Sequence, residues 1–299
     1  MKIIINADDF GIDIDRDFGI FYGVMKGYVT SVSIVVTDKI GLIRKILVWM
    51  MRKKASIGIH INLTDNPLVK YNMEEICDIN YEYERRKYVF WKNSIDNKLN
   101  INKIKEEIDE QFDRFMKEYG FIPNHIDGHN HCNIFNKEVE EIFEEISKTY
   151  NIHLRIPYED LNKFDKSLLE NNEYFNKYYM LKNEVDKDTI NNNLDYFFKY
   201  DMYLYNYMCI ENCIKDINYI GTMYGYFRYS KILIDQLLKF DKKDCVQVMT
   251  HPGFYWRFIK HNTKFSNKDR NIELKSLKSL KKQSKKLKFI YTDYKNYKK

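Results

Sequence analysis

Two adjacent carboxylates follow the first apolar run of the chain. Asp8 and Asp9 come one residue after 2–6, a continuous run that is typical of a strand buried on both faces. Two carboxylates at the end of such a strand repel each other unless a cation or a shared proton compensates their charges. The pair therefore predicts a cation site or, as the simpler alternative, a solvated turn in which an Asp caps the next helix.

Histidines occupy two comparable positions further along the chain. His60 lies at the end of a second apolar run, 56–63, where a lone histidine is more typical of a hydrogen-bonded core residue than of a ligand. His251 follows the apolar run 245–250 and precedes a proline, which restricts its backbone to an extended conformation. Each of these histidines stands where a predicted strand ends.

The segment 125–131, with the sequence HIDGHNH, holds three imidazoles and one carboxylate, Asp127. His125 and His129 have the i, i+4 spacing of a helical zinc pair, but the glycine between them and a preceding proline disfavour a helix. We therefore expect only one of these two histidines to bind a metal ion.

Strand and helix patterns alternate along most of the chain, which is typical of a parallel sheet with helices packed outside it. The candidate strands are enough for an α/β barrel, in which active sites form at the carboxyl ends of the strands. The Asp pair, His60, the 125–131 cluster and His251 are all expected at that edge. The predicted strands are 2–6, 30–36, 56–63, 125–128, 152–156, 219–222, 245–250 and 288–292, and the predicted helices are 17–27, 40–53, 101–119, 136–150 and 231–240.

The domain organisation follows from where the candidate residues lie. The 299 residues could form one domain or two, but motifs spread from residue 6 to residue 253 need the intervening chain to bring them together, so we expect one domain. The region 161–206 has weak periodicity and is rich in Asn, Lys and Tyr; it could be an inserted lobe, a lid or expanded helices. Leucines at helical spacing predict an amphipathic helix over 272–286, with a solvated Lys face away from the site.

Composition excludes several classes of protein. Lys and Arg number 49 against 43 Asp and Glu, a net charge of +6, and 44% hydrophobic residues are enough for a packed core, so a disordered chain is excluded. The absence of Arg clusters with interleaved aromatics argues against a nucleic-acid partner. Five cysteines without a CxxC pair suit a reducing compartment. No apolar run approaches the roughly 20 residues of a membrane helix, and no signal-peptide core is recognisable, so we expect a cytoplasmic protein without a membrane partner.

Taken in order, NADDFG, GIHINLT, HIDGHNH, RIPYE at 155–159 and HPG at 251–253 resemble the motifs of the YdjC-like carbohydrate deacetylases, a family of chitooligosaccharide deacetylase type. The resemblance runs from residue 3 to residue 253. It implies a distorted TIM-like barrel of the α/β class and a hydrolase that removes the N-acetyl group from an N-acetylated sugar or oligosaccharide. It also implies a homodimer as one option for the oligomeric state.

The resemblance further implies a divalent metal ion, with Mg²⁺ as the family's ion. Asp9, His60 and His129 match the three ligands, and Asp8 matches the catalytic base, as in the more distant NodB-type polysaccharide deacetylases. By ligand type alone, two imidazoles and one carboxylate also suit Zn²⁺ or another transition metal.

Amide hydrolysis must also place a proton on the leaving amine, and a histidine that titrates near neutrality suits that task. His251 is the predicted acid, with His131 as the alternative. Arg155 is expected to orient substrate or to steady Asp8, and we expect His131 and Asp127 also to bind substrate. One departure from the family stands in the same region: Asn133 replaces the last histidine of the family's run, which bears on the substrate more than on the metal.

Two other functions stay open at this point. One is a metal-dependent phosphoesterase or lyase on the same barrel, although the chain has no Gly-rich phosphate loop and no Arg pair beside the His cluster. The other is a catalytically inactive sugar-binding homologue. Asn133 favours the second, while the intact Asp8, Asp9, His60, His129 and His251 disfavour it.

Overall fold

One parallel sheet organises the protein. The computed structural model describes residues 1–37, 40–65, 68–77, 86–158, 217–221, 230–255 and 267–297. Their strands form one sheet in the order β5-β4-β3-β2-β1-β7-β6, with β8 paired to β1, and every pair of neighbours is parallel. The strands are β1 (Lys2–Phe10), β2 (Ser31–Ile34), β3 (Ser56–Ile61), β4 (His125–Gly128), β5 (His153–Leu154), β6 (Asn218–Ile220), β7 (Cys245–Thr250) and β8 (Ile290–Tyr291).

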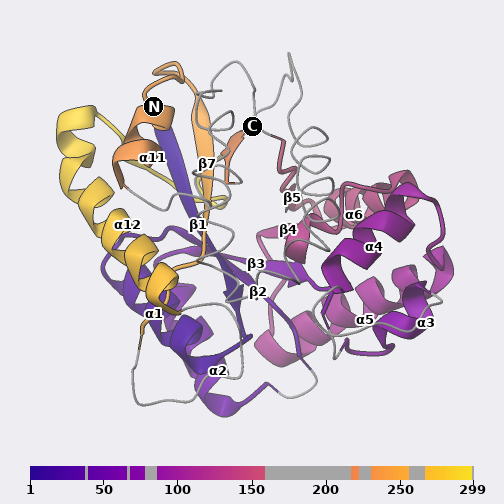
Figure 1. Ribbon diagram of the computed structural model, residues 1–299. Coiled ribbons are helices and arrows are strands. Elements are labelled where there is room, and N and C mark those ends of the chain that lie inside the picture. The colour runs from indigo at the N-terminus through magenta and orange to yellow at the C-terminus, as the bar shows by residue number, and fades with distance from the viewer. Residues whose placement is uncertain are drawn as a thin grey trace, which may run out of the picture.

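Helices cover the outside of this curled sheet (Figure 1). Neighbours in the helical layer contact one another in the order α11, α12, α1, α2, α5, α6, which follows the strands around the sheet. The predicted distorted TIM-like α/β fold is therefore confirmed. The described helices are α1 (Ile14–Met25), α2 (Leu42–Met51), α3 (Met73–Cys77), α4 (Arg86–Ile95), α5 (Ile101–Tyr119), α6 (Lys137–Tyr150), α11 (Ser230–Leu237) and α12 (Asn267–Leu287), with a 3-10 turn at His129–His131.

The central strands are buried on both faces. All six residues of β3 and all six of β7 are buried, and only Lys2 of β1 is exposed. Each large apolar side chain buried in this way contributes about 1.5–3 kcal/mol. A sheet covered on both faces explains why these strands appear in the sequence as short continuous apolar runs.

Helix α5 matches its predicted bounds for reasons that are visible in the sequence. The side chain of Asn100 caps its first turn by accepting the Lys103 N–H at 3.2 Å, and Gly120 ends it with a left-handed φ of 73°. Its apolar stripe is buried, and so are two polar residues on the same face, Glu107 and Gln111. Those two side chains hold a loop that leads to the site.

The structure differs from the prediction at the end of the first strand, and it does not describe the predicted insert. Strand β1 does not end at residue 6, as predicted, but runs to Phe10, so Asp8 and Asp9 lie within it. Phe10 pairs with Ile34 of β2, which extends the sheet past the carboxylates. No pairing between β5 and β6 closes the barrel among the described residues, and the predicted insert at 161–206 lies outside them.

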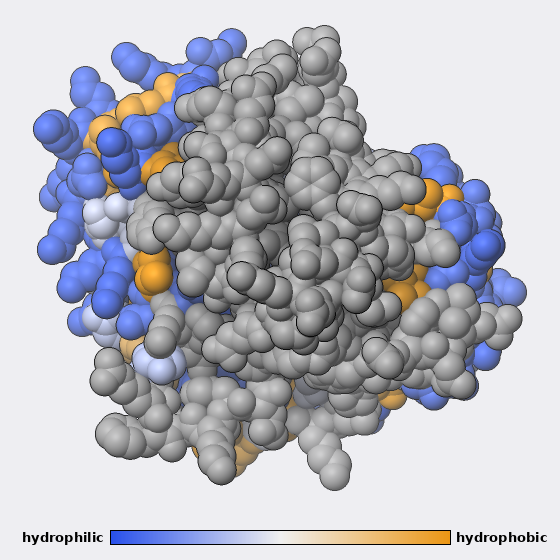
Figure 2. Space-filling model, viewed as in Figure 1, coloured by the Kyte–Doolittle hydropathy of each residue, from blue (hydrophilic) through white to orange (hydrophobic). Residues whose placement is uncertain are grey.

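The C-terminal amphipathic helix is α12, which starts at Asn267, five residues before the predicted bound. Its leucines Leu274, Leu277 and Leu280 are buried, while Lys275 and Lys278 are exposed. Hydrophilic side chains dominate the surface over this helix (Figure 2). No helix within the described ranges is long and apolar enough to cross a membrane.

Gly19 of α1 permits a close approach that brings the segment after β7 to the site. A Cβ at this position would lie 2.4 Å from the Cα of Gly253. We therefore expect Gly19→Ala to lower the free energy of unfolding by about 1–3 kcal/mol through overpacking, measured by urea denaturation. Gly41, whose Cβ would meet nothing within 4 Å, is the control: Gly41→Ala should cost at most about 1 kcal/mol, from its N-cap position. Equal stability of the two variants would contradict this contact.

Candidate metal centre and active site

A bulge in β1 turns both carboxylates toward one site. Residues Ala7 and Phe10 pair with Val32 and Ile34, so Asp8 and Asp9 together stand opposite one residue of β2. Asp9 has a left-handed φ of 71°, which is uncommon for a residue other than glycine. Adjacent residues of a regular strand point to opposite faces, and the bulge removes that alternation.

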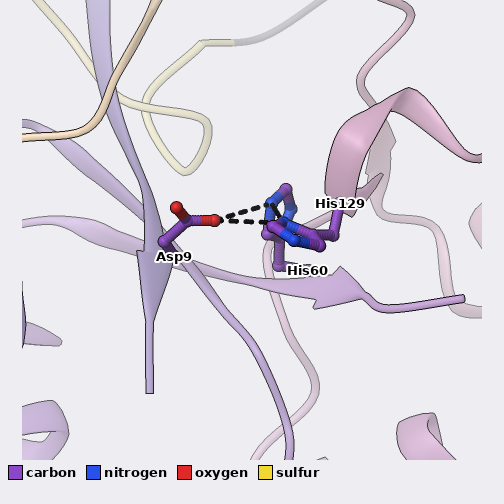
Figure 3. A group of neighbouring side chains, drawn as sticks. All are labelled: Asp9, His60 and His129. Carbon is purple, nitrogen blue, oxygen red and sulfur yellow. Dashed lines mark hydrogen bonds and ion pairs between the residues drawn. The ribbon is translucent and has the colours of Figure 1, made fainter. Parts of the chain in front are cut away.

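Asp9, His60 and His129 form the candidate metal site (Figure 3). Their ligand atoms lie within 4.8 Å of one another, and all three residues are buried. Oδ1 of Asp9 is 3.6 Å from Nε2 of His60 and 3.1 Å from Nδ1 of His129, and these two nitrogens are 3.4 Å apart. The ligands come from β1, from β3 and from the turn after β4, so they meet at the carboxyl edge of the sheet.

The partners of the two imidazoles decide which nitrogens face the site. Nδ1 of His60 lies 2.6 Å from Oδ1 of Asp127, and Nε2 of His129 lies 2.8 Å from Oδ2 of Asp65. A neutral imidazole carries one proton, which each carboxylate draws to the nitrogen beside it. The other two nitrogens then direct lone pairs at each other and at Oδ1 of Asp9, which has no hydrogen-bond partner. Three converging electron-pair donors fit a bound cation.

The charges around the ligands favour a cation as well. Burial alone would lower the pKa of His129, but Asp9 and Asp65 outweigh it and raise the pKa to about 10. Burial would likewise lower the pKa of His60, and the charges of Asp127 and Asp8 raise it instead. Although burial opposes its ionisation, Arg16 and His129 hold the pKa of Asp9 well below its ordinary value. The negative surroundings that attract protons to these imidazoles would equally attract a metal ion.

Asp8 is held beside the ligands as an ionised carboxylate. Arg155 binds both of its oxygens at 2.7 Å, in the bidentate arrangement that suits a guanidinium. Oδ1 also accepts from Nδ2 of Asn6 at 2.6 Å, whereas Oδ2 lies 3.7 Å from Nε2 of His60. Burial would raise the pKa of Asp8, but Arg155 and His60 lower it. Of the two expectations for Arg155, the geometry matches the one in which it steadies Asp8.

Asp127 lies behind the ligands and not at a substrate-facing surface. It is fully buried; Oδ1 faces His60, and Oδ2 accepts from Ser33 Oγ at 2.6 Å and lies 3.1 Å from Arg155 Nη1. The expectation that it binds substrate does not fit this position, because both oxygens are engaged inside the protein. Its neighbour His125 is also buried, with Nε2 2.9 Å from Ser33 Oγ, and is not part of the ligand group.

The turn after β4 carries His131 and Asn133. His131 is half-buried, has φ 55°, and holds a buried Nδ1 that lacks a hydrogen-bond partner. Burial and Arg155 lower its pKa to about 3. Asn133 is buried and donates to the carbonyl oxygen of Arg155 at 3.3 Å. The residue that departs from the family pattern therefore holds the backbone of the arginine that binds Asp8.

His251 directly follows Thr250, which pairs with Ala7 of β1, the residue before Asp8. Its peptide N–H donates to the carboxylate of Glu273, and its carbonyl accepts from Nη1 of Arg270 at 3.4 Å. Arg270 also reaches Oδ2 of Asp9 at 3.6 Å. The first turns of α12 thus contact the site through the buried residues Arg270 and Glu273, a contact that was not predicted, while Lys275 and Lys278 of the same helix are exposed.

The pattern of the YdjC-like protein family matches residues 2–285. The chain belongs to the YdjC-like family.

Among solved structures, a candidate cellobiose-phosphate cleavage protein from Enterococcus faecalis has a TM-score of 0.66 and 20% identity, over 98% of this chain and 97% of that one. A polysaccharide deacetylase from Bacillus cereus has a TM-score of 0.44 and 8% identity, over 99% and 93% of the two chains. A peptidoglycan deacetylase from Bacillus subtilis has 0.41 and 10%, over 97% and 85%. No curated protein matches the chain.

Four residues of this YdjC-like site were not predicted from the sequence. Arg16 binds Oδ2 of Asp9 at 2.8 Å, and Asp65, Arg270 and Glu273 hold the ligands or His251 from outside. Asp65 follows the GIHINLT motif directly, so its nearness to His60 in sequence was a usable signal. No comparable signal in the sequence pointed to the buried residues Arg270 and Glu273. They occur in a helix whose composition is dominated by lysine.

The ligand assignment of the YdjC-like site can be tested through metal content. We expect His60→Ala and His129→Ala to lose the metal that copurifies with the wild type when no chelator is used, because each removes one of three donors. Metal analysis of the purified proteins gives the stoichiometry. His153→Ala is the matched control, since His153 packs beside Tyr294 and outside the ligand group. Wild-type metal content in both ligand variants would contradict the assignment.

Proposed function

We propose that this chain is a metal-dependent carbohydrate deacetylase that hydrolyses the N-acetyl group of an N-acetylated sugar. The observation that carries the proposal is that two carboxylates with different partners lie close to the same nitrogen of His60. Asp9 Oδ1 and Asp8 Oδ2 lie 3.6 and 3.7 Å from Nε2 of His60, yet Asp9 faces the other ligand and Asp8 faces Arg155. One carboxylate is thus suited to hold an ion, and the other to move a proton beside it.

The ligand group sets what an ion could supply. A divalent metal ion held by Asp9, His60 and His129 would act as a Lewis acid toward water and toward the acetyl carbonyl. Two nitrogen donors and one carboxylate suit Zn²⁺, Co²⁺ or Ni²⁺ by ligand type, and Mg²⁺ by resemblance to the family.

Asp8 takes the proton of the attacking water. Its Oδ1 already accepts from both Arg155 and Asn6, so Oδ2, with one donor and with His60 nearby, is the oxygen that has room for a proton. The lowered pKa of Asp8 keeps it ionised at neutral pH. The low basicity that comes with this pKa is tolerable only where the water is itself made more acidic, as in a metal-assisted hydrolysis.

His251 supplies the proton for the leaving amine. As the new C–O bond forms and the C–N bond breaks, the sugar nitrogen must gain a proton, and acetate and a free amine leave. His251 follows Thr250, the partner of Ala7 in β1, and its peptide N–H and carbonyl are held by Glu273 and Arg270. A proline after it limits its backbone further.

The proposal is tested by acetate release from a panel of N-acetylated mono- and oligosaccharides, with and without EDTA. We expect release that EDTA abolishes. In Asp8→Asn, kcat should fall by about 10²–10⁴-fold, the usual contribution of a general base, while metal content stays at the wild-type value. Asp113→Asn, an exposed carboxylate on α5, is the control and should keep full activity.

Three results would each contradict a different part of the proposal. Acetate release by metal-replete Asp8→Asn near the wild-type rate would remove Asp8 as the base. Release that is insensitive to EDTA would remove the metal. Phosphate release from sugar phosphates without acetate release from any N-acetyl sugar would instead favour the phosphoesterase alternative.

A further inference from the structure

Each histidine of the candidate metal centre has a carboxylate on its outer nitrogen, but the two carboxylates differ in their surroundings. Asp127, the partner of His60, is fully buried within the sheet. Asp65, the partner of His129, lies in a loop after β3, and 49% of its side chain is exposed. What holds Asp65 in place therefore needs a separate explanation.

The loop itself is folded around one side chain, that of Asn62. Its Oδ1 accepts the peptide N–H groups of Thr64 and Asp65 at 3.1 and 3.0 Å, and its Nδ2 donates to the carbonyl of Asp65 at 2.6 Å. These three bonds bend the chain directly after β3 and fix the backbone of Asp65 on both sides. The bend is an Asx-type turn, which an asparagine favours.

Side chains of helix α5 hold this turn through hydrogen bonds. Gln111 accepts the N–H of Asn62 at 2.9 Å and donates to its carbonyl at 2.7 Å, so one buried amide occupies both polar groups of that residue. Gln111 also donates to Glu107 at 2.7 Å. The Glu107 carboxylate accepts three further N–H groups of the loop, from Val69, Lys70 and Tyr71, at 2.7–3.0 Å. Both anchoring side chains are at most 1% exposed.

A second link joins the loop to the turn that carries His129. Nδ2 of Asn130 donates to Oγ1 of Thr64 at 2.8 Å, next to the contact between Asp65 and His129. Asn130 has a left-handed φ of 49°, which interrupts the short 3-10 turn His129–His131. Asp65 therefore contacts the outer nitrogen of a ring that stands on an irregular backbone.

We propose that Asp65 is a positioning residue of the metal centre, and that Asn62, Gln111 and Glu107 form its support. Asp65 keeps the proton of His129 on Nε2, so that Nδ1 presents its lone pair toward Asp9 and His60. Helix α5 thereby determines the affinity for the metal through a loop, without supplying any ligand. This inference rests on the metal centre of the proposed function, but not on the reaction.

The test is a titration of metal-free protein with Co²⁺ alone, followed by its visible absorption and by competition with a chelator of known affinity. We expect Asp65→Ala to raise the Kd by about 10–100-fold, the usual cost of removing a carboxylate behind a ligating histidine. Asp65→Asn should fall between this variant and the wild type, because a neutral amide oxygen can still accept the Nε2 proton. Gln111→Ala should raise the Kd in the same direction although it lies outside the site.

Glu106→Gln is the matched control. Glu106 neighbours Glu107 on α5 and contacts the side chains of Lys70, which is exposed, and Tyr71, which is half-buried, and not the loop backbone. The Kd of the Glu106→Gln variant for Co²⁺ should equal that of the wild type. Thermal unfolding of the metal-free proteins should be similar for Asp65→Ala and the wild type, since Asp65 is half-exposed, which separates positioning from a general loss of structure.

The outcomes distinguish this inference from the proposed function. A Kd for Asp65→Ala within about twofold of the wild type would overturn the inference and leave the deacetylase proposal standing. The expected series of Kd values in a protein that releases no acetate would support the inference and overturn the proposed reaction. Equal binding by the wild type and His129→Ala would overturn the metal centre and the inference together.

Discussion

The bulge in β1 is the constraint on which the site depends. A strand places neighbouring side chains on opposite faces, so two adjacent carboxylates could not ordinarily serve one site. In this chain the left-handed backbone of Asp9 and the extra residue opposite β2 bring Asp8 and Asp9 to the same imidazole. The other charged and polar groups of the site are arranged around these two negative charges. His60 and His129 face it, and arginines surround it.

Those arginines keep two similar groups chemically distinct. Arg155 engages both oxygens of Asp8, while Arg16 engages only Oδ2 of Asp9 and leaves Oδ1 toward the histidines. Removing one member of a buried ion pair commonly costs about 3–5 kcal/mol, because the remaining charge is left uncompensated. The ion pairs of the site therefore also contribute to the stability of the fold.

The outer helices contribute to the chemistry through the sheet edge. Helix α5 holds the loop of Asp65, and α12 holds the peptide groups around His251 and reaches Asp9. Both helices are amphipathic in sequence, and their buried polar residues interrupt the apolar stripe. Buried Glu107, Gln111, Arg270 and Glu273 would be costly without partners, and their partners are the backbone and side chains of the site. Buried polar residues on outer helices of such a barrel thus indicate which loops are held in a fixed position.

The sequence by itself determined the order of the strands and of most helices, the bounds of α5 and β4, and the residues that could do chemistry; helices α3 and α4 were not predicted. Short apolar runs, helical periodicity and capping residues are local signals, and a parallel sheet brings the ends of its strands to one edge whatever the details. The glycine between His125 and His129, together with the proline before them, predicted that they do not act as a helical pair. The family pattern then related Asp9, His60 and His129 to one another.

Only the tertiary structure decided how these residues divide their tasks. That Asp127 supports His60, that Arg155 holds Asp8, and that α12 reaches Asp9 all depend on pairings between residues 67 to 261 positions apart. The bulge that unites Asp8 and Asp9 is a property of the pairing of β1 with β2, not of either strand alone. Local sequence cannot encode which of two adjacent carboxylates a distant arginine will reach, because that choice is made by packing.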